Sequence, residues 1–225
     1  MSKKLTVKIT TGRDDALLLY AELNSAQTSA GGRPDGVAQP CRYDQHHLRC
    51  AQRHVVTALA NHPNPMNETD LMHLRTSIEL AWKARERGNH PFGAVLANAD
   101  GLRLLIAENT VSTERDVTGH AELNLVRLAT HDLSAEQLTQ CTLYASTEPC
   151  AMCAGAVFWA GIGRVVYALA ETDLYALIGQ SAGQLVIPCR EVFARAGRPT
   201  QVEGPCAELG HEAHAVHAGF WKRRA

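Results

Sequence analysis

The sequence predicts a three-layer α/β/α domain, in which a mixed β-sheet is covered by helices on both faces. Two observations support this fold class. From about residue 66, helical patterns alternate with short apolar runs in the order helix, hairpin, helix, strand, helix, strand, which is the order of an α/β domain. The composition agrees, because 225 residues with 45% hydrophobic and 20% charged residues are enough for one sizeable core in a globular protein.

The domain is predicted to span residues 66–225. It begins directly after Asn61-His-Pro-Asn-Pro65, where two prolines restrict the residues before them and prevent a helix from continuing. Residues 1–65 form an N-terminal extension that we expect to be partly disordered, since residues 29–36 are a run of turn formers with nothing to bury.

The extension contains a loose group of cysteines and histidines: Cys41, His46, His47, Cys50 and His54. Their spacing matches no zinc motif that we can defend. A helix that carries incidental histidines is therefore our preferred interpretation, and a second zinc site is the alternative.

The first element of the domain is predicted to be an amphipathic helix. Its apolar residues recur at helical spacing, Asn67 or Thr69 can cap its start, and Gly88 suits its end. Residues 92–97 and 102–108 then predict a β-hairpin, because these two apolar runs flank a turn that ends in Asp-Gly.

A second helix is predicted to begin at His120. A polar loop over residues 110–118 precedes it. We expect Ala121, Leu125 and Leu128 to form its buried stripe, because they recur at helical spacing.

The central part of the sequence predicts a strand, a helix and a strand. After a polar stretch over residues 130–140, residues 141–146 predict a strand that leads into a helix starting near Cys150. This helix is apolar on all sides, so we expect it to be buried. Gly161 ends the helix, and residues 164–168 predict the next strand.

The signals are weaker toward the C-terminus. We expect a helical turn at residues 174–178, a short helix at 188–194 and strand potential at 200–202. A terminal amphipathic helix starts near Leu209 and carries three histidines at three-residue spacing. Because that spacing drifts around the helix, we expect solvated or capping roles for them rather than a metal site. These histidines are His211, His214 and His217.

Two cysteines three residues apart carry the clearest chemical signal. Cys150 and Cys153 follow Pro149, so both thiols lie on one face at the positive end of a helix, where thiolates are favoured and can bind a metal. His120 supplies a third ligand, and Glu122 follows two residues later. Three protein ligands leave a fourth position for water, which is typical of a catalytic zinc site rather than a structural one.

The pattern His-x-Glu with Pro-Cys-x-x-Cys downstream is the signature of the zinc-dependent nucleobase deaminases. Residues 90–98, 108–129 and 141–168 together resemble the cytidine-deaminase-like superfamily. Within it they resemble the branch that contains bacterial guanine deaminases and tRNA adenosine deaminases. The resemblance covers about residues 66–178 and implies a cytidine-deaminase-like fold for them.

The resemblance also implies how the site works. His120, Cys150 and Cys153 are then the ligands of one zinc ion per chain, with a zinc-held water in the fourth position. Zinc lowers the pKa of that water to about 7. Glu122 takes the proton, hydroxide adds to the amidine carbon of the base, and Glu122 then protonates a ring nitrogen and the departing ammonia.

The substrate-binding residues that the resemblance implies are Phe92, Asn109, Ala121, Trp159 and Asp173. Several of them have ordinary structural alternatives. Asn109 could be a turn former and Phe92 a core residue, and Trp159 would be buried on composition alone. Asp173 could be a solvated loop carboxylate, with Glu171 at the substrate in its place.

We expect hydrolysis of a C–N bond in a purine-type nucleobase or nucleoside, with guanine favoured. Trp159, Asp173 and the formal net charge of −1 support a small-molecule substrate. The alternative is a tRNA adenosine-to-inosine deaminase, which residues 151–156 and 162–166 resemble. That enzyme needs a basic surface, and here basic residues are concentrated only at 222–224.

A third possibility from another class is a non-enzymatic, zinc-stabilised interaction module. Glu122 argues against it, because a structural zinc site has no use for an unliganded carboxylate. The resemblance implies a homodimer, in which the C-terminal tail closes the pocket of its own or of the neighbouring subunit.

We expect a cytoplasmic protein. No apolar run approaches the roughly 18 residues of a membrane span, and the two lysines near the start are not followed by the apolar segment of a secretory signal. Seven cysteines without an export signal argue for metal binding or free thiols rather than disulfides. The near-neutral charge makes nucleic acid an unlikely default partner.

Overall fold

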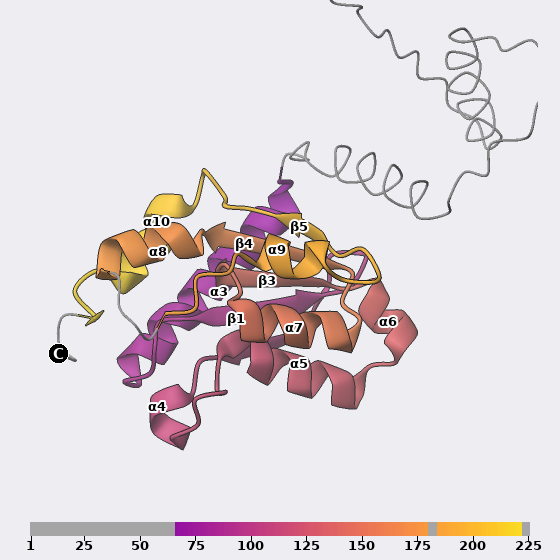
Figure 1. Cartoon of the computed structure of the whole chain (residues 1–225), viewed down its shortest axis with the longest axis horizontal. Coiled ribbons are helices and arrows are strands. Elements are labelled where there is room, and N and C mark those ends of the chain that lie inside the picture. Colours follow the sequence, from indigo (N-terminus) through magenta and orange to yellow (C-terminus); the bar gives the residue numbers. More distant parts are fainter. Residues whose placement is uncertain (1–65, 180–183, 222–225) are drawn as a thin grey trace, which may run out of the picture. The chain divides into compact units, whose positions relative to one another are not determined.

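The computed structural model describes residues 66–179 and 184–221 (Figure 1). The predicted N-terminal extension with its cysteines and histidines therefore lies outside the described residues, as do the basic residues at 222–224. Within the described ranges, none of the helices combines the length and the apolar composition that a membrane crossing requires.

The core of the domain is a five-stranded mixed sheet with the strand order β2-β1-β3-β4-β5. Its strands are β1 (Gly93–Ala97), β2 (Arg103–Glu108), β3 (Thr142–Thr147), β4 (Arg164–Leu169) and β5 (Gln201–Glu203). Strand β1 is antiparallel to both β2 and β3, whereas β3, β4 and β5 run parallel. The predicted mixed sheet is confirmed.

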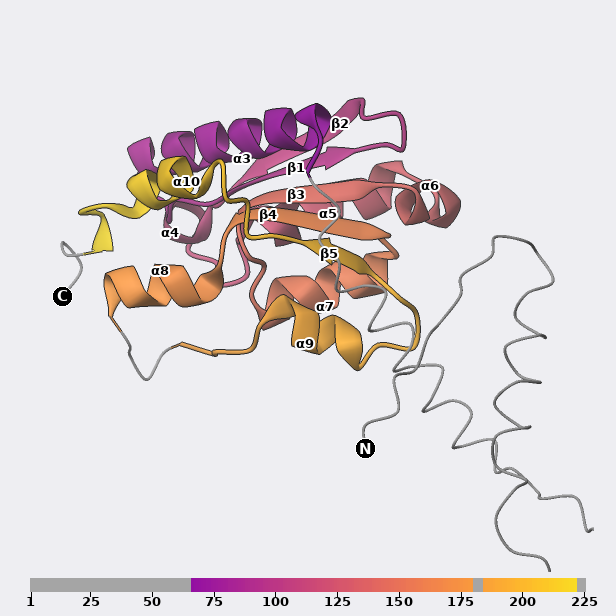
Figure 2. The same ribbon diagram turned by 90° about the horizontal axis from the view of Figure 1, so that it is seen from above.

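Helices cover both faces of this sheet (Figure 2). One face carries α3 (Glu68–Glu86) and α10 (Gly210–His217), and the other carries α5 (Ala121–Asp132), α7 (Ala151–Ala160) and α9 (Cys189–Ala194). Alternate strand residues point to opposite layers. Val95 and Val166 pack with α3 and α10, whereas Leu143 packs with α5 and α7. The three-layer prediction is therefore confirmed.

Local signals account for most of the boundaries. Asn67 caps α3 in a capping box with Asp70, and Gly161 ends α7 in the left-handed conformation with φ 91°. Two short helices, α4 (Val111–Glu114) and α6 (Ala135–Thr139), were not predicted. Both are polar, so they lack the apolar periodicity on which helix prediction depends.

Two expectations about helix faces were wrong. Leu128 is 48% exposed, and the buried stripe of α5 continues from Leu125 to Ala129 instead. Helix α7 is not buried on all sides, since Trp159 is 85% exposed and Met152 is 38% exposed. An apolar composition sets how much of a helix avoids water, but tertiary contacts decide which face is covered.

A partly buried ion-pair network joins α3 to the sheet. Arg164 donates to both carboxylate oxygens of Asp70, at 2.7 and 3.0 Å, and also to Glu203, at 2.8 and 3.0 Å. Tyr144 donates its hydroxyl to Asp70 at 2.9 Å. Burial raises the pKa of Asp70, but these hydrogen bonds outweigh it and hold the pKa below its usual value. The network thus links α3, β3, β4 and β5.

Replacing Asp70 by asparagine should lower the free energy of unfolding by about 3 kcal/mol, because it leaves part of a buried charge network uncompensated. Because the folded-state pKa of Asp70 is lowered, its contribution is complete above the unfolded pKa and is lost as the pH falls through the folded pKa. Urea unfolding at pH 7 and in acid measures both effects. The exposed Glu191–Arg195 pair provides the control, since Glu191→Gln should change stability by less than about 0.5 kcal/mol. Equal effects of the two substitutions would contradict this prediction.

Candidate active site

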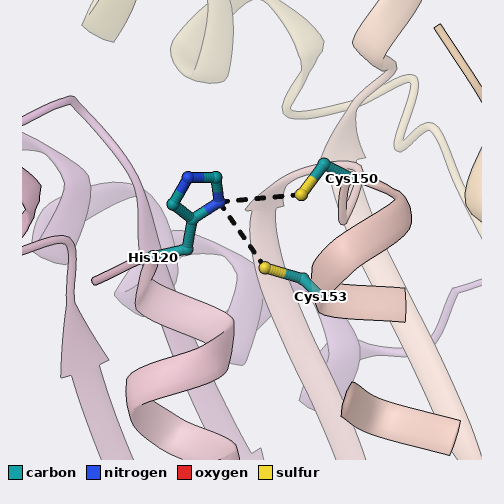
Figure 3. Close-up of side chains that lie close together, drawn as sticks. All are labelled: His120, Cys150 and Cys153. Carbon is teal, nitrogen blue, oxygen red and sulfur yellow. Dashed lines mark hydrogen bonds between the residues drawn. The ribbon is translucent and has the colours of Figure 1, made fainter. Parts of the chain in front are cut away.

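The structure brings the three predicted metal ligands together from two helices (Figure 3). The Nδ1 atom of His120 lies 3.6 Å from the sulfur of Cys150 and 3.6 Å from the sulfur of Cys153. The three ligand atoms all lie within 4.8 Å of one another. A tetrahedral zinc ion with Zn–S bonds of about 2.3 Å and Zn–N bonds of about 2.0 Å places its sulfur and nitrogen ligands about 3.5 Å apart. The donor set and its spacing therefore fit zinc.

The starts of two helices position these ligands. His120 is the residue directly before α5, and Cys150 is the residue directly before α7. Cys153 lies in the first turn of α7 and is fully buried. Because a helix start carries a partial positive charge, both sulfurs are favoured as thiolates. Strand β3 leads directly into α7, which places the site at the end of the sheet where ligands bind in open α/β folds.

The charges within the site already favour metal binding. A hydrogen bond from Cys153 lowers the pKa of Cys150 to about 4, and His120 contributes in the same direction. That same bond with Cys150, together with burial, raises the pKa of Cys153 well above its usual value. Cysteine binds zinc as the thiolate, so the lowered pKa of Cys150 favours metal binding.

Glu122 is buried beside the three ligands but does not belong to the group that can hold the metal. It is 5% exposed. Burial raises its pKa to about 7, and the negative charge of Cys150 contributes to the shift. A carboxyl group with this pKa can both accept and donate a proton at neutral pH.

Three of the implied substrate-binding residues lie near the ligands. The backbone N–H of Asn109 donates to the carbonyl of Phe92 at 3.1 Å, so these two residues are adjacent. The backbone N–H of Thr110 donates to the carbonyl of Gly119 at 2.8 Å, which joins the end of β2 to the start of the His120 helix. Ala121 follows His120 and is fully buried.

The two other implied residues, Trp159 and Asp173, are both exposed. Trp159 lies nine residues beyond Cys150, about 13 Å along the axis of α7, and its side chain is in solvent. Asp173 is exposed in the first turn of α8 (Glu171–Ile178). Glu171 is buried instead and accepts a hydrogen bond of 2.7 Å from the hydroxyl of Tyr175. Burial, together with the nearby negative charge of Cys150, raises the pKa of Glu171 to about 7.

Glu148 is a residue of the site that the sequence analysis missed. Its carboxylate accepts a backbone hydrogen bond from Glu171 at 3.2 Å and another from Cys189 at 2.9 Å. It therefore fixes the starts of α8 and α9 relative to the loop that carries Cys150. The sequence signal that could have indicated its role is its position directly before Pro149, two residues from the metal ligand Cys150.

His217 corrects another expectation. It was expected in solvent or at a cap, but it is 1% exposed and its Nε2 atom lies 3.2 Å from the hydroxyl of Thr147. Its spacing from the buried Ala213 could have indicated an inward position, since residues four apart share a helix face. His211 and His214 are exposed, as expected.

The comparisons with known proteins agree with this geometry. The model of the family "Cytidine and deoxycytidylate deaminase zinc-binding region" matches residues 67–169. A probable cytosine deaminase from Schizosaccharomyces pombe is 41% identical over 159 residues, which cover 69% of this chain and 94% of that protein. A guanine deaminase from Bacillus subtilis is 38% identical over 130 residues, which cover 53% of this chain and 83% of that protein.

A solved structure also has a similar fold. It is the crystal structure of a protein in complex with 2,6-diaminopurine, which superposes with a TM-score of 0.59 at 28% sequence identity. The match covers 76% of this chain and 90% of the other.

Proposed function

Because the chain belongs to the zinc-dependent deaminases of the cytidine-deaminase-like superfamily, we propose that it hydrolyses the exocyclic C–N bond of a purine-type nucleobase or nucleoside, with guanine as the favoured substrate. One observation carries this proposal: the ligand atoms of His120, Cys150 and Cys153 are spaced for zinc, while the buried carboxyl of Glu122 lies outside that ligand group. A purely structural zinc site needs four protein ligands and no such acid.

The residues of the chain divide the work of the reaction. A zinc ion held by His120, Cys150 and Cys153 supplies an acidified water at neutral pH. Glu122 takes a proton from this water and passes it to a ring nitrogen of the base. The carbon that held the amino group gains the oxygen, and Glu122 delivers the second proton to the nitrogen that leaves. Water is consumed, and the products are a carbonyl group and ammonia.

The purine preference has two supports. A guanine deaminase is among the relatives, and a protein of similar fold has been solved with 2,6-diaminopurine, a purine with two amino groups. The exposed position of Trp159 withdraws the support that this residue gave to guanine, whereas Asp173 stays a proposed contact of the base. Cytosine is the second candidate, because the Schizosaccharomyces pombe relative is a probable cytosine deaminase.

Ammonia release identifies the substrate directly. Zinc-loaded protein is offered guanine, guanosine, 2,6-diaminopurine, adenine and cytosine in parallel, together with an adenosine-containing tRNA. We expect the highest kcat/KM with guanine. A higher kcat/KM with cytosine would replace guanine by the second candidate. Salt-sensitive binding of the tRNA with inosine formation would favour the tRNA alternative.

We also propose that the protein is a homodimer that buries the open face of α7. Met152 and Trp159 are the exposed apolar residues of this helix, and Gly155 and Ala156 lie between them, half-buried. This i, i+3, i+4, i+7 spacing places all four on one face. An exposed apolar stripe of this kind marks an interaction surface. A second copy of the chain presents the same stripe and can pair with it around a two-fold axis.

Replacing Trp159 by glutamate should weaken the dimer about 100-fold or more, because aromatic residues at the centre of an interface dominate its binding energy. Light scattering after size-exclusion chromatography, run over a range of protein concentrations, measures the mass. Leu102 is exposed in the turn between β1 and β2, and Leu102→Glu is the matched control that should leave the dimer intact. The proposal fails if the wild-type protein is a monomer, or if Trp159→Glu leaves the mass unchanged.

A further inference from the structure

The end of the C-terminal helix region places two rings against Phe92. The ring of His217 lies 5.3 Å from that of Phe92, measured between centroids, and the ring of Trp221 lies 6.2 Å from it. His217 and Trp221 are themselves 6.1 Å apart and nearly parallel, with 15° between their planes. Helix α10 packs on the α3 side of the sheet (Figure 2), so these rings approach the end of the sheet from the layer opposite the metal ligands.

Only one of the two ring nitrogens of His217 has a partner. The Nε2 atom lies 3.2 Å from the hydroxyl of Thr147, which is three residues before Cys150. The Nδ1 atom is buried without a hydrogen-bond partner. Burial lowers the pKa of His217 to about 3, with smaller contributions from His214 and Arg85. The imidazole is therefore neutral at physiological pH, with one nitrogen that donates and one that accepts.

Two other buried groups around Phe92 also lack partners. The Nδ2 atom of Asn109 has none, and the backbone of that residue is bonded to Phe92. The Nε1 atom of Trp221 has none either. Within the described ranges, four buried side-chain atoms lack a partner, and three of them belong to residues around this one phenylalanine.

Such a cluster needs an explanation. Leaving one buried polar atom unpaired costs about 1–3 kcal/mol, and native proteins contain few such atoms. All three belong to residues that contact Phe92, and a molecule bound beside this ring would supply the missing partners. A base with polar atoms on its ring edge has this chemistry.

We propose that His217 is a specificity-determining residue whose Nδ1 atom hydrogen-bonds the ring edge of the substrate base, while Thr147 holds its Nε2 atom. This inference rests on the proposed function and names a contact that the metal site alone does not provide. Asn109 meets the same base through its Nδ2 atom.

Two amide substitutions separate the two ring nitrogens. In His217→Asn the amide group lies near the position of Nδ1, whereas in His217→Gln it lies near that of Nε2. Calorimetric binding of 2,6-diaminopurine and of guanine is measured in zinc-loaded Glu122→Gln protein, in which turnover is slowed about a thousand-fold or more. We expect His217→Gln to weaken binding about 10- to 100-fold and His217→Asn to weaken it by less than about 5-fold. In the active background, His217→Gln should raise KM with little change in kcat.

A neighbouring histidine provides the matched control. His214 lies on the same helix and is exposed, so His214→Gln should bind both bases like the parent protein. Zinc content and the melting temperature of every variant are measured alongside. The proposal is overturned if His217→Gln binds as tightly as the parent, or if His217→Asn and His217→Gln lose binding equally, since the loss then comes from ring packing. If the wild-type protein binds none of the bases, the proposed function fails together with it.

Discussion

Replacing Glu122 by glutamine should lower kcat by about a thousand-fold or more, because a positioned proton-transfer group contributes roughly 10²- to 10⁴-fold to the rate. The protein should keep its zinc, since the carboxyl group does not belong to the ligand group. It should also keep its stability. Burial already raises the pKa of Glu122 to about 7, so a neutral amide of the same size suits the site. Ammonia release and metal analysis on the same sample measure the two effects.

An exposed glutamate provides the control for this experiment. Glu136 lies in the short helix α6 and is exposed, so Glu136→Gln should leave kcat, zinc content and melting temperature unchanged. Activity that survives Glu122→Gln would remove the proposed proton transfer. Loss of zinc in Glu122→Gln would instead show that the carboxylate is needed to hold the metal.

Replacing Cys153 by serine should remove the metal, the activity and much of the stability together. Its sulfur is fully buried at the zinc position, and a ligand set reduced to two residues holds zinc poorly. Metal-binding free energy contributes directly to folding. Zinc at a thousand times its dissociation constant stabilises the folded state by about 4 kcal/mol, so we expect a loss of this order. Metal analysis and urea unfolding measure it.

Cys141 gives a matched control, because it is buried too but donates its S–H to the carbonyl of Gln137 instead of facing the metal site. Cys141→Ser retains a hydrogen-bond donor and should keep one zinc ion per chain. A Cys153→Ser protein that still binds one zinc ion per chain would exclude Cys153 as a ligand. If both variants lost the same stability, the loss in Cys153→Ser would come from burial of a polar hydroxyl and not from loss of the metal.

The sheet and the metal site could be predicted from the sequence because both have short-range signals. A run that is apolar at every position, such as Ala94 to Ala97, indicates a strand whose two faces both lie against apolar layers, as the structure has it. The cysteine spacing of α7 fixes both thiols on one face whatever the rest of the chain does. His120 required a long-range match, and the deaminase signature supplied it.

The positions of individual side chains on helices could not be predicted, because they depend on the packing partner. His214 and His217 have the same chemistry and lie on the same helix, yet only His217 meets the sheet. Asp173 and Glu171 both lie in the first turn of α8, yet Asp173 is exposed, whereas Glu171 is buried with its carboxylate bonded to the hydroxyl of Tyr175.

The short helices α4 and α6 were missed because they bury little apolar surface. Helix α6 has a capping box formed by Ser134 and Gln137, whereas backbone N–H groups of α4 bond to the distant Asn89.

The two backbone bonds of Glu148 suggest how this architecture tolerates evolutionary change. The carboxylate accepts hydrogen bonds from the backbone N–H groups of residues 171 and 189, which lie at the two ends of one segment of the chain. Because both ends of this segment bond to Glu148, in the loop before Cys150, an insertion or deletion within the segment need not change the positions of the sulfur ligands. The positions of the sulfur ligands therefore do not depend on the length of the chain between these two attachment points.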